Sequence, residues 1–295
     1  MATKIKNRLN NLSGREWLPL TRSAYVDGVT RPSEELDWDN VLRESQGSIV
    51  VMSKATPRDH LKKQHPATFA EEDARRLVRM FTQEGQHVLD PFIGSGSAAI
   101  ACVLEKRACT GFDIYEQWVQ LANERIRKVI DYSPYPIRIE AKDALTAMKQ
   151  MDAESQDFIL TSPPYWGILQ KTDHKAKSER SKDGLATDYG DNDAYDLGRI
   201  NSYDRFLDVL TEHFREWIRV LKHRAYTAVI VSDFRHQSRY YPFHAHVGEC
   251  LEKVGMTLQG MVVIVQDSKR LYPYGYPTTY VPNICNQFVV IARKL

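Results

Sequence analysis

Short apolar runs alternate with amphipathic stretches along most of the chain. The apolar runs predict strands at 87–90, 109–114, 137–141, 157–161, 226–232, 258–265 and 287–292. Between them, apolar positions recur at helical spacing over 69–83, 97–107, 116–130, 143–150, 203–222 and 243–254. This alternation predicts an α/β fold in which helices cover both faces of a mostly parallel sheet. The last two runs are joined by a segment without helical period, so we expect them to pair antiparallel at one edge of the sheet.

Two segments fall outside this alternation. Residues 1–53 are polar and poorly periodic, apart from a short strand pattern at 49–52. They predict an extension packed through its tryptophans or, alternatively, a basic arm that contacts phosphate. Residues 167–201 carry a series of cations followed by acidic residues, and a stretch of this kind inside a domain is usually a functional lid or disordered. We therefore divide the chain into an extension, 1–53, and a main domain, 54–295, with an insert at about 167–201.

The first predicted strand leads into a glycine-rich turn, Asp90-Pro91-Phe92-Ile93-Gly94-Ser95-Gly96. Glycines allow backbone N–H groups to approach a ligand closely. The spacing Gly94-x-Gly96-x-x-Ala99 also fits the fingerprint of dinucleotide-binding proteins. Asp113 ends the next strand, at a separation from the glycines that suits an acceptor for ribose hydroxyls.

Two other carboxylates follow strand ends. Asp90 would repel a phosphate and attract an amino group, which favours a cationic ligand over a pyrophosphate; alternatively, it caps the following turn. Asp143 can accept a hydrogen bond from an adenine amino group or cap the helix at 144–150, and the sequence favours neither interpretation.

The fourth predicted strand stops at Thr161-Ser162-Pro163-Pro164-Tyr165-Trp166. Two prolines cannot continue a central strand because they lack N–H donors. The hydroxyl of Ser162, the free carbonyls near the prolines and the ring of Tyr165 could form a notch for a planar ring that carries an exocyclic amine. The alternative is a rigid Pro-Pro turn without a ligand, and in that case Trp166 belongs to the core.

Composition excludes several classes of protein. A chain with 42% hydrophobic and 26% charged residues is ordinary for a globular protein, and 40 Lys+Arg against 38 Asp+Glu is too balanced to require a nucleic-acid partner. The four cysteines form no CxxC pair and the histidines show no metal-ligand spacing, so we predict a reduced protein without a metal. No apolar run is long enough to cross a membrane and no N-terminal apolar segment is visible, so we expect a cytoplasmic protein.

Together, these motifs resemble those of the DNA amino-methyltransferases that use S-adenosylmethionine. The turn at 90–97 looks like their cofactor motif, and Ser162-Pro163-Pro164-Tyr165 is similar to their catalytic motif. Lys54 and His65-Pro66-Ala67-Thr68-Phe69 look like the motif that closes over the methionine end of the cofactor. The resemblance covers about 54–295, and it departs from the family in that no long separate target-recognition domain is visible.

The resemblance implies a Rossmann-like class I methyltransferase fold, with a seven-stranded, mostly parallel sheet and an antiparallel edge strand. The cofactor contacts that it implies are Lys54, His65, Pro66, Phe69, Asp90, Phe92, Gly94, Gly96, Asp113 and Asp143. The catalytic residues that it implies are Ser162, Pro163, Pro164 and Tyr165. Loops at the same end of the sheet would contact double-stranded DNA, with candidates at Lys171, Lys175, Arg235, Lys269 and Arg270.

The implied reaction is methyl transfer to the exocyclic N4 amine of a cytosine flipped out of DNA. A serine in the catalytic motif looks like the cytosine-N4 branch, whereas asparagine or aspartate is commoner in the adenine-N6 branch, and no cysteine follows a proline to attack cytosine C6. Such an enzyme would be an epigenetic methylase or the partner of a restriction nuclease in a bacterium, archaeon or phage. The alternatives are adenine-N6 methylation, methylation of an RNA base, a nicotinamide dehydrogenase that uses the glycine fingerprint, and an inactive DNA-binding module.

Overall fold

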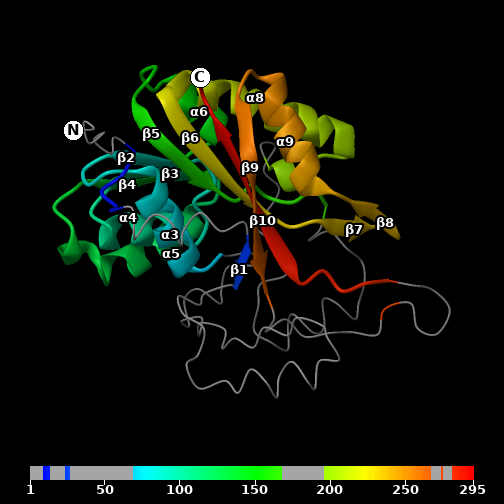
Figure 1. Cartoon of the computed structure of the whole chain (residues 1–295), viewed down its shortest axis with the longest axis horizontal. Helices are drawn as coiled ribbons and strands as arrows, with labels where there is room; N and C mark the ends of the chain where they lie inside the picture. Colours follow the sequence, from blue (N-terminus) through cyan, green and yellow to red (C-terminus); the bar gives the residue numbers. More distant parts are fainter. Residues whose placement is uncertain (1–8, 14–23, 27–68, 168–195, 267–273, 275–280) are drawn as a thin grey trace, which may run out of the picture.

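An eight-stranded sheet forms the centre of the protein (Figure 1). The structure is a computed structural model, and it describes residues 9–13, 24–26, 69–167, 196–266, 274 and 281–295. The strand order is β1-β9-β10-β6-β5-β2-β3-β4. Their bounds are β1 Ala24–Val26, β2 His87–Asp90, β3 Ala108–Asp113, β4 Ile137–Ala141, β5 Gln156–Thr161, β6 Leu221–Val231, β9 Thr257–Val265 and β10 Asn286–Arg293.

The predicted fold class is confirmed, because all seven predicted strands form one α/β sheet. Neighbouring strands are parallel except around β10, which pairs antiparallel with both β6 and β9. The predicted antiparallel pairing of the last two strands therefore holds. The eighth strand, β1, was not predicted; it comes from the expected extension and pairs parallel with β9.

Helices form a layer on each face of the sheet, as the alternation predicts (Figure 1). Along β5, the side chains of Phe158 and Leu160 pack in one apolar cluster and that of Ile159 packs in the other, because successive strand residues point to opposite faces. The first cluster contains α3 (Glu71–Phe81), α4 (Ser97–Leu104) and α5 (Glu116–Arg127), and the second contains α6 (Ala144–Lys149), α8 (Tyr203–Val220) and α9 (Phe243–Lys253).

Some helices and strands begin or end at residues other than those predicted from the sequence. β6 begins at Leu221 rather than near 226, because its first residues after Leu221 are exposed and polar and give no apolar signal. The helix expected at 116–130 ends at Arg127 and is followed by a 3-10 turn, η2 (Ile130–Tyr132). The helix expected at 69–83 spans Glu71–Phe81. The strand predicted at 49–52 lies outside the described residues.

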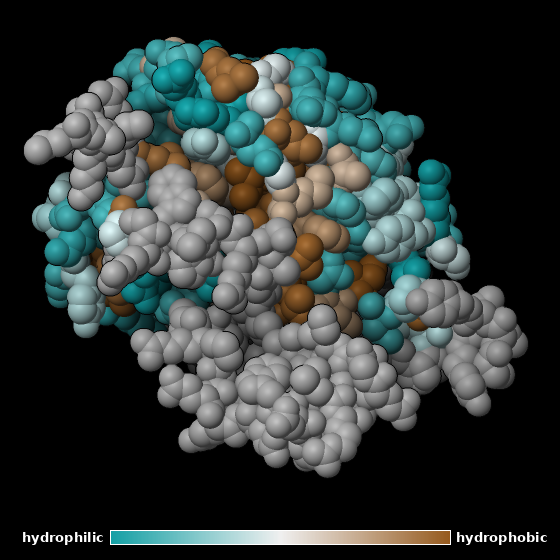
Figure 2. Space-filling view, viewed as in Figure 1, coloured by the Kyte–Doolittle hydropathy of each residue, from teal (hydrophilic) through white to brown (hydrophobic). Residues whose placement is uncertain are grey.

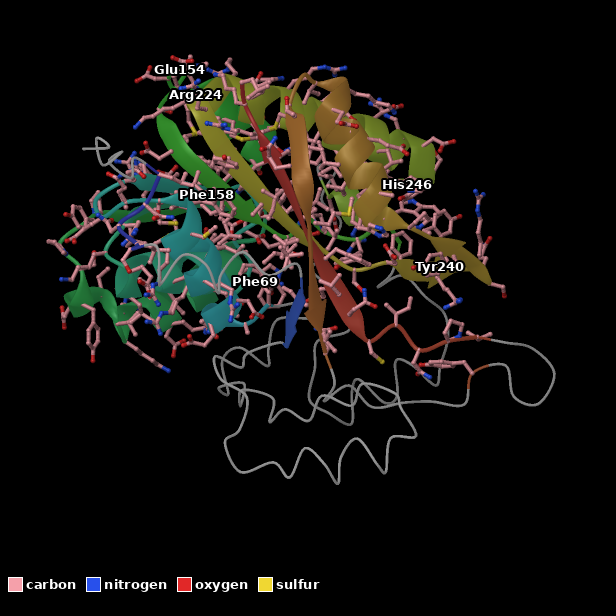
Figure 3. The ribbon with its side chains drawn as sticks, viewed as in Figure 1. Phe69, Glu154, Phe158, Arg224, Tyr240 and His246 are labelled. Carbon is pink, nitrogen blue, oxygen red and sulfur yellow. The ribbon has the colours of Figure 1, made fainter. Side chains whose placement is uncertain are left out.

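A small hairpin projects from the carboxyl end of β6 (Figure 1). It consists of β7 (Phe234–His236) and β8 (Arg239–Tyr241), which are joined by a two-residue turn. Figure 3 shows Tyr240 on this hairpin and His246 on α9, at the same end of the molecule. Polar residues cover much of the surface in Figure 2, where apolar side chains gather along the middle of the view.

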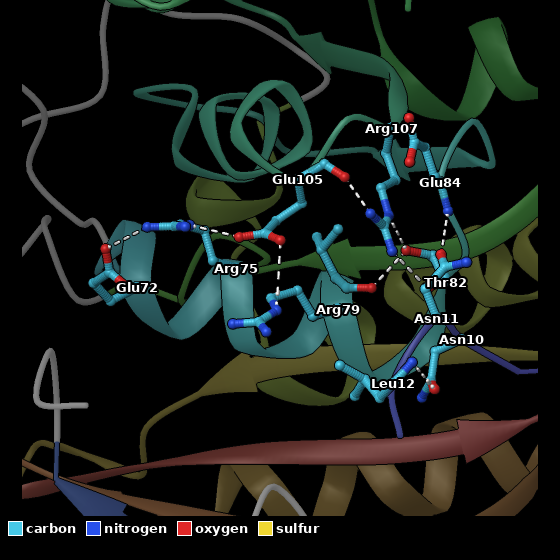
Figure 4. Close-up of polar contacts among 11 residues, drawn as sticks. Asn10, Asn11, Leu12, Glu72, Arg75, Arg79, Thr82, Glu84, Glu105 and Arg107 are labelled. Atoms are coloured by element: carbon cyan, nitrogen blue, oxygen red, sulfur yellow. Dashed lines mark hydrogen bonds and ion pairs between the residues drawn. The ribbon is translucent and has the colours of Figure 1, made fainter. Parts of the chain in front are cut away.

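Polar contacts fasten α3 to the loop that follows α4 (Figure 4). Nε of Arg75 donates to the carboxylate of Glu105 at 2.8 Å, and Nε of Arg107 donates to Oγ1 of Thr82 at 2.9 Å. Nδ2 of Asn10 donates to the carbonyl of Met80 at 2.6 Å, so the N-terminal residues described here also pack on this helix. Arg107 directly precedes β3, so these contacts lie near the amino ends of the parallel strands.

Candidate active site

A cavity opens at the carboxyl ends of the parallel strands, where open α/β sheets bind ligands. It has contributions from the loops after β2, β3, β4 and β5 and from α8. Among the residues predicted from sequence, its lining includes Phe69, Phe92, Gly94, Asp113, Asp143, Ser162, Pro163 and Pro164. Residues far apart in the sequence are thus brought to one place by the sheet topology.

The glycine turn forms one wall of the cavity. Gly94 lines it with a φ of +47°, a conformation that favours glycine. Gly96 lies behind the wall: its φ is +80°, and a Cβ added there would lie 3.0 Å from the Cβ of Ala122 in α5. The guanidinium of Arg125, also in α5, donates to the carbonyl of Ser95 and binds the carboxylate of Glu71. Gly96 therefore supports the turn through close helix packing and is not part of the cavity lining.

Asp90 is fully buried beside this turn and does not line the cavity. Its Oδ1 accepts from the backbone N–H of Phe92 at 3.1 Å and from the hydroxyl of Thr161, which joins the ends of β2 and β5. Its Oδ2 has no hydrogen-bond partner among the described residues. Burial raises the pKa of Asp90 to about 7. The carboxyl group organises the turn, and the contact with an amino group stays a prediction.

Asp113 links β3 to the glycine turn. Its Oδ2 accepts from the N–H of Gly94 at 3.2 Å and its Oδ1 from the N–H of Tyr115 at 3.0 Å. Burial, with a smaller contribution from the charge of Asp196, raises the pKa of Asp113 to about 7. The hydroxyl of Tyr115 donates to Oδ2 of Asp196 at 2.9 Å, so the end of the predicted insert is held beside the cavity.

Asp143 caps a helix at the cavity, and its contact with an adenine amino group stays a prediction. Its Oδ2 accepts from the N–H of Thr146 at 2.7 Å and so caps α6, and the residue also lines the cavity. His213 faces the cavity from α8 and is 2% exposed. Burial lowers the pKa of His213 to about 4, so its imidazole is neutral at physiological pH.

The Pro-Pro turn separates into two parts. Ser162 and both prolines line the cavity, whereas Tyr165 packs away from it. The hydroxyl of Tyr165 accepts from the N–H of Ser232 at 2.7 Å, and its ring centroid lies 5.6 Å from that of Phe243. Trp166 is buried and donates from Nε1 to the carbonyl of Ile200 at 2.8 Å, so it belongs to the core.

Of the predicted DNA-contacting cations, the structure describes Arg235. It lies on β7, with its guanidinium 5.3 Å from the ring centroid of Tyr240. The other residues predicted for the cofactor or for DNA, namely Lys54, His65, Pro66, Lys171, Lys175, Lys269 and Arg270, lie outside the described residues.

Sequence reasoning missed several cavity residues: Tyr115, Trp118, Lys142, Asp196, Leu197 and His213. Tyr115 and Lys142 each lie within two residues of a predicted carboxylate, so proximity could have identified them. His213 is one polar position in an amphipathic helix, and nothing in the local pattern distinguishes it. Among the described residues, no group of three metal-ligating side chains could hold a metal ion, and no helix is long and apolar enough to cross a membrane.

The fold and the cavity define an α/β protein with a cavity at the carboxyl ends of its parallel strands. Residues 30–124 match the model of a family described as DNA methylase. The orphan methyltransferase M.BamHII of Bacillus amyloliquefaciens is 38% identical over 72 residues, which are 24% of this chain and 27% of that protein. The type II methyltransferase M.MjaI of Methanocaldococcus jannaschii is 39% identical over 113 residues, which are 38% of this chain and 34% of that protein. The aligned segments thus span about a third or less of these curated relatives.

Solved structures that partly resemble this chain include a SAM-dependent methyltransferase from Methanosarcina mazei. Its sequence identity is 15% and its TM-score is 0.47, and the alignment covers 74% of this chain and 97% of the other. TrmN from Thermus thermophilus has 17% identity, a TM-score of 0.43, and coverage of 76% and 48%. The family match over residues 30–124 and the partial likeness to these curated methyltransferases confirm the resemblance to the N4/N6 family, and the activity of the whole protein is taken up below as a proposal.

Proposed function

We propose that this protein transfers a methyl group from S-adenosylmethionine to the exocyclic N4 amine of a cytosine that is flipped out of DNA. The observation that carries the proposal is that Ser162 and both prolines of the catalytic motif line the same cavity as Asp113 and Asp143. A methyl donor and an acceptor amine must meet in one site, because orientation of the two reacting groups dominates the rate.

The cavity residues fit S-adenosylmethionine. Asp113 keeps carboxylate lone pairs for ribose hydroxyls after accepting its two backbone N–H bonds. Asp143 uses Oδ2 as a helix cap and retains Oδ1 to accept from the adenine amino group. Phe92 supplies an apolar surface to the cavity. Asp90 lies behind the cavity wall, so its contact with the charged amino group stays a prediction that this fit does not use. When bound, the cofactor supplies an electrophilic methyl group on a sulfonium sulfur.

The target amine is a weak nucleophile because its lone pair is delocalised into the base. Acceptors for its two N–H bonds would localise that lone pair, and Oγ of Ser162 and the carbonyl of Pro163 are the groups that we assign to this task. A base in a duplex cannot enter the cavity, so the target must leave the helix, which costs a few kcal/mol. Stacking on an aromatic ring would return about 1–3 kcal/mol. Tyr165 packs outside the cavity, so its predicted stacking on the base would require the ring to move.

DNA contacts are proposed for loops at this end of the sheet. The hairpin β7–β8 carries Arg235 and Arg239 and contains no acidic residue between Phe234 and Tyr241. Its aromatic side chains and cations suit phosphate contact combined with stacking. We also propose that the protein acts in the cytoplasm of a bacterial or archaeal cell, encoded by the cell or by a phage, as an epigenetic methylase or beside a cognate nuclease.

Methylation of an adenine-N6 amine is the second candidate, because the matched family covers both amines. The serine of the catalytic motif favours cytosine over adenine. The curated relatives reported above are named as methyltransferases, which favours methyl transfer over a nicotinamide-dependent reaction.

The proposal is tested by methyl transfer from labelled S-adenosylmethionine to plasmid DNA. Ser162→Ala removes one of the two acceptors, and we expect the rate to fall about 10²–10³-fold, as for loss of one preorganised hydrogen-bonding group in other active sites. Ser155→Ala, at a surface turn where the hydroxyl donates to the carbonyl of Asp152, is the matched control and should retain the full rate. An active Ser162→Ala variant would refute the role of this hydroxyl, and an inactive wild type would refute the proposed function.

A further inference from the structure

His213 has the features of a ligand-binding residue that the catalytic proposal leaves without a task. It comes from the middle of α8, lines the cavity and is 2% exposed. Its Nδ1 is buried and has no hydrogen-bond partner among the described residues. Buried polar atoms in folded proteins are almost always paired, and those that are unpaired in the free protein often acquire their partner from a ligand or a water.

The protonation state of His213 restricts what that partner can be. Burial keeps the ring neutral, and a neutral imidazole carries one N–H donor and one acceptor nitrogen. No described residue forms a hydrogen bond with Nδ1. The contacts of Nδ1 therefore do not decide which ring nitrogen carries the proton. The ring can therefore present an N–H to a ligand acceptor with little rearrangement, since the bond made by one nitrogen sets the tautomer of the other.

The position of His213 in the cavity indicates which part of the ligand it meets. Its ring centroid lies 5.2 Å from that of Phe92, at an interplanar angle of 43°. Helix α6 packs against α8, and the charge of its cap residue Asp143 acts on the imidazole. His213 thus shares a corner of the cavity with the carboxylate that we assign to the adenine amino group.

Adenine offers complementary chemistry to this pair. Its amino group is a donor, and the ring nitrogens on the same edge are acceptors. A carboxylate can only accept, whereas a neutral imidazole can donate, so Asp143 and His213 together match one donor and one acceptor on a purine. We infer that His213 is a positioning residue for the cofactor, which donates a hydrogen bond to a ring nitrogen of its adenine. The inference rests on the proposed function, since it takes S-adenosylmethionine as the ligand.

Calorimetric titration of the full-length chain with S-adenosylhomocysteine tests this inference without requiring activity. His213→Phe keeps an aromatic ring against Phe92 but removes the donor, and it should weaken binding about 3- to 10-fold. His213→Gln retains an N–H donor and should bind within about twofold of the wild type. His223→Phe, at an exposed position of β6, is the matched control and should bind like the wild type.

The affinity for adenosine, measured by competition with S-adenosylhomocysteine, shows which part of the cofactor His213 contacts. If His213 donates to the purine, His213→Phe weakens adenosine by the same factor as S-adenosylhomocysteine. A loss for S-adenosylhomocysteine alone would place the contact on the amino-acid end and overturn the assignment to adenine.

The remaining outcomes separate the inference from the proposed function. Unchanged binding of S-adenosylhomocysteine by His213→Phe would overturn the inference while leaving the proposed function intact, whereas a wild type that binds neither compound would overturn both. If His213→Phe fails to fold, as judged by its thermal melt, a His213→Gln variant that binds more than about 10-fold weaker would contradict the expected rescue.

Discussion

Replacement of Asp90 by asparagine should stabilise the protein at alkaline pH. Asp90 is fully buried between the ends of β2 and β5, and an asparagine side chain would keep the shape and the Oδ1 acceptor used by Phe92 and Thr161. Burial raises the pKa of Asp90 from 3.8 to about 7, so the folded state favours the protonated carboxyl. The stability that the protonated carboxyl contributes is fully present below about pH 4 and is lost as the pH rises through about 7.

The size of the effect follows from the shift. A shift of about three pKa units, at about 1.4 kcal/mol each, makes ionised Asp90 cost about 4 kcal/mol above pH 8. The Asp90→Asn variant avoids this cost but leaves an amide hydrogen unpaired where Oδ2 now has no partner, so we expect a gain of about 2–3 kcal/mol at pH 8. The gain should disappear near pH 5, where Asp90 is protonated in the folded protein.

Urea unfolding of the wild type and of Asp90→Asn at pH 5 and pH 8 measures this difference. Asp113 is present in both proteins and its charge makes the smallest contribution to the raised pKa of Asp90, so the comparison reports mainly on Asp90. Asp152→Asn, at an exposed position before β5, is the matched control and should not change the pH dependence. If Asp90→Asn is no more stable than the wild type at pH 8, or if the difference is equal at both pH values, the account of a buried, destabilising carboxylate is wrong. We also expect the variant to bind S-adenosylhomocysteine more weakly, because a stability cost retained in an active site commonly serves the ligand.

Three further predictions concern the turn, the hairpin and the DNA. Gly96→Ala should destabilise the protein by about 1–3 kcal/mol in urea unfolding, because the φ of +80° is strained for alanine and the new Cβ would lie 3.0 Å from a side chain of α5; an unchanged midpoint would contradict this. Replacing Gln237 and Ser238 by Asn-Gly should raise the free energy of unfolding by about 1 kcal/mol, since both residues have positive φ in a two-residue hairpin turn; a loss of stability would show that their side chains matter. Arg235→Gln should weaken duplex binding and reduce the slope of log K against log salt by about 0.9, whereas Arg224→Gln, at the opposite end of β6, should do neither; equal effects would argue against a hairpin contact.

The sheet could be predicted from the sequence because its central strands are buried on both faces and are therefore almost continuously apolar. Three elements lacked that signal. β1 is three residues long, the first part of β6 is polar and exposed, and the hairpin β7–β8 turns through Gln-Ser without the glycine that usually marks such a turn. β1 and the first part of β6 depend on backbone pairing with distant partners, which local periodicity does not encode, whereas the hairpin pairs locally through a turn without the usual sequence signal.

The candidate site also contains residues that the sequence predicts and residues that it does not. Carboxylates at strand ends and the Pro-Pro turn are visible in sequence because parallel topology brings consecutive strand ends together. Asp90 and Gly96 belong to the predicted motif, yet they shape the glycine turn from behind the cavity wall. Asp196 and His213 reach the cavity from distant segments, and only the packing of α8 and the loop before it shows that they do.

Nucleoside mass spectrometry of plasmid DNA treated with the wild-type protein and S-adenosylmethionine tests the central claim most directly. The account predicts N4-methylcytosine, formed with the cofactor and absent without it. N6-methyladenine alone would contradict the choice of cytosine while leaving a DNA amino-methyltransferase. DNA that stays unmethylated, in a preparation that binds S-adenosylhomocysteine, would contradict the claim that this cavity methylates DNA.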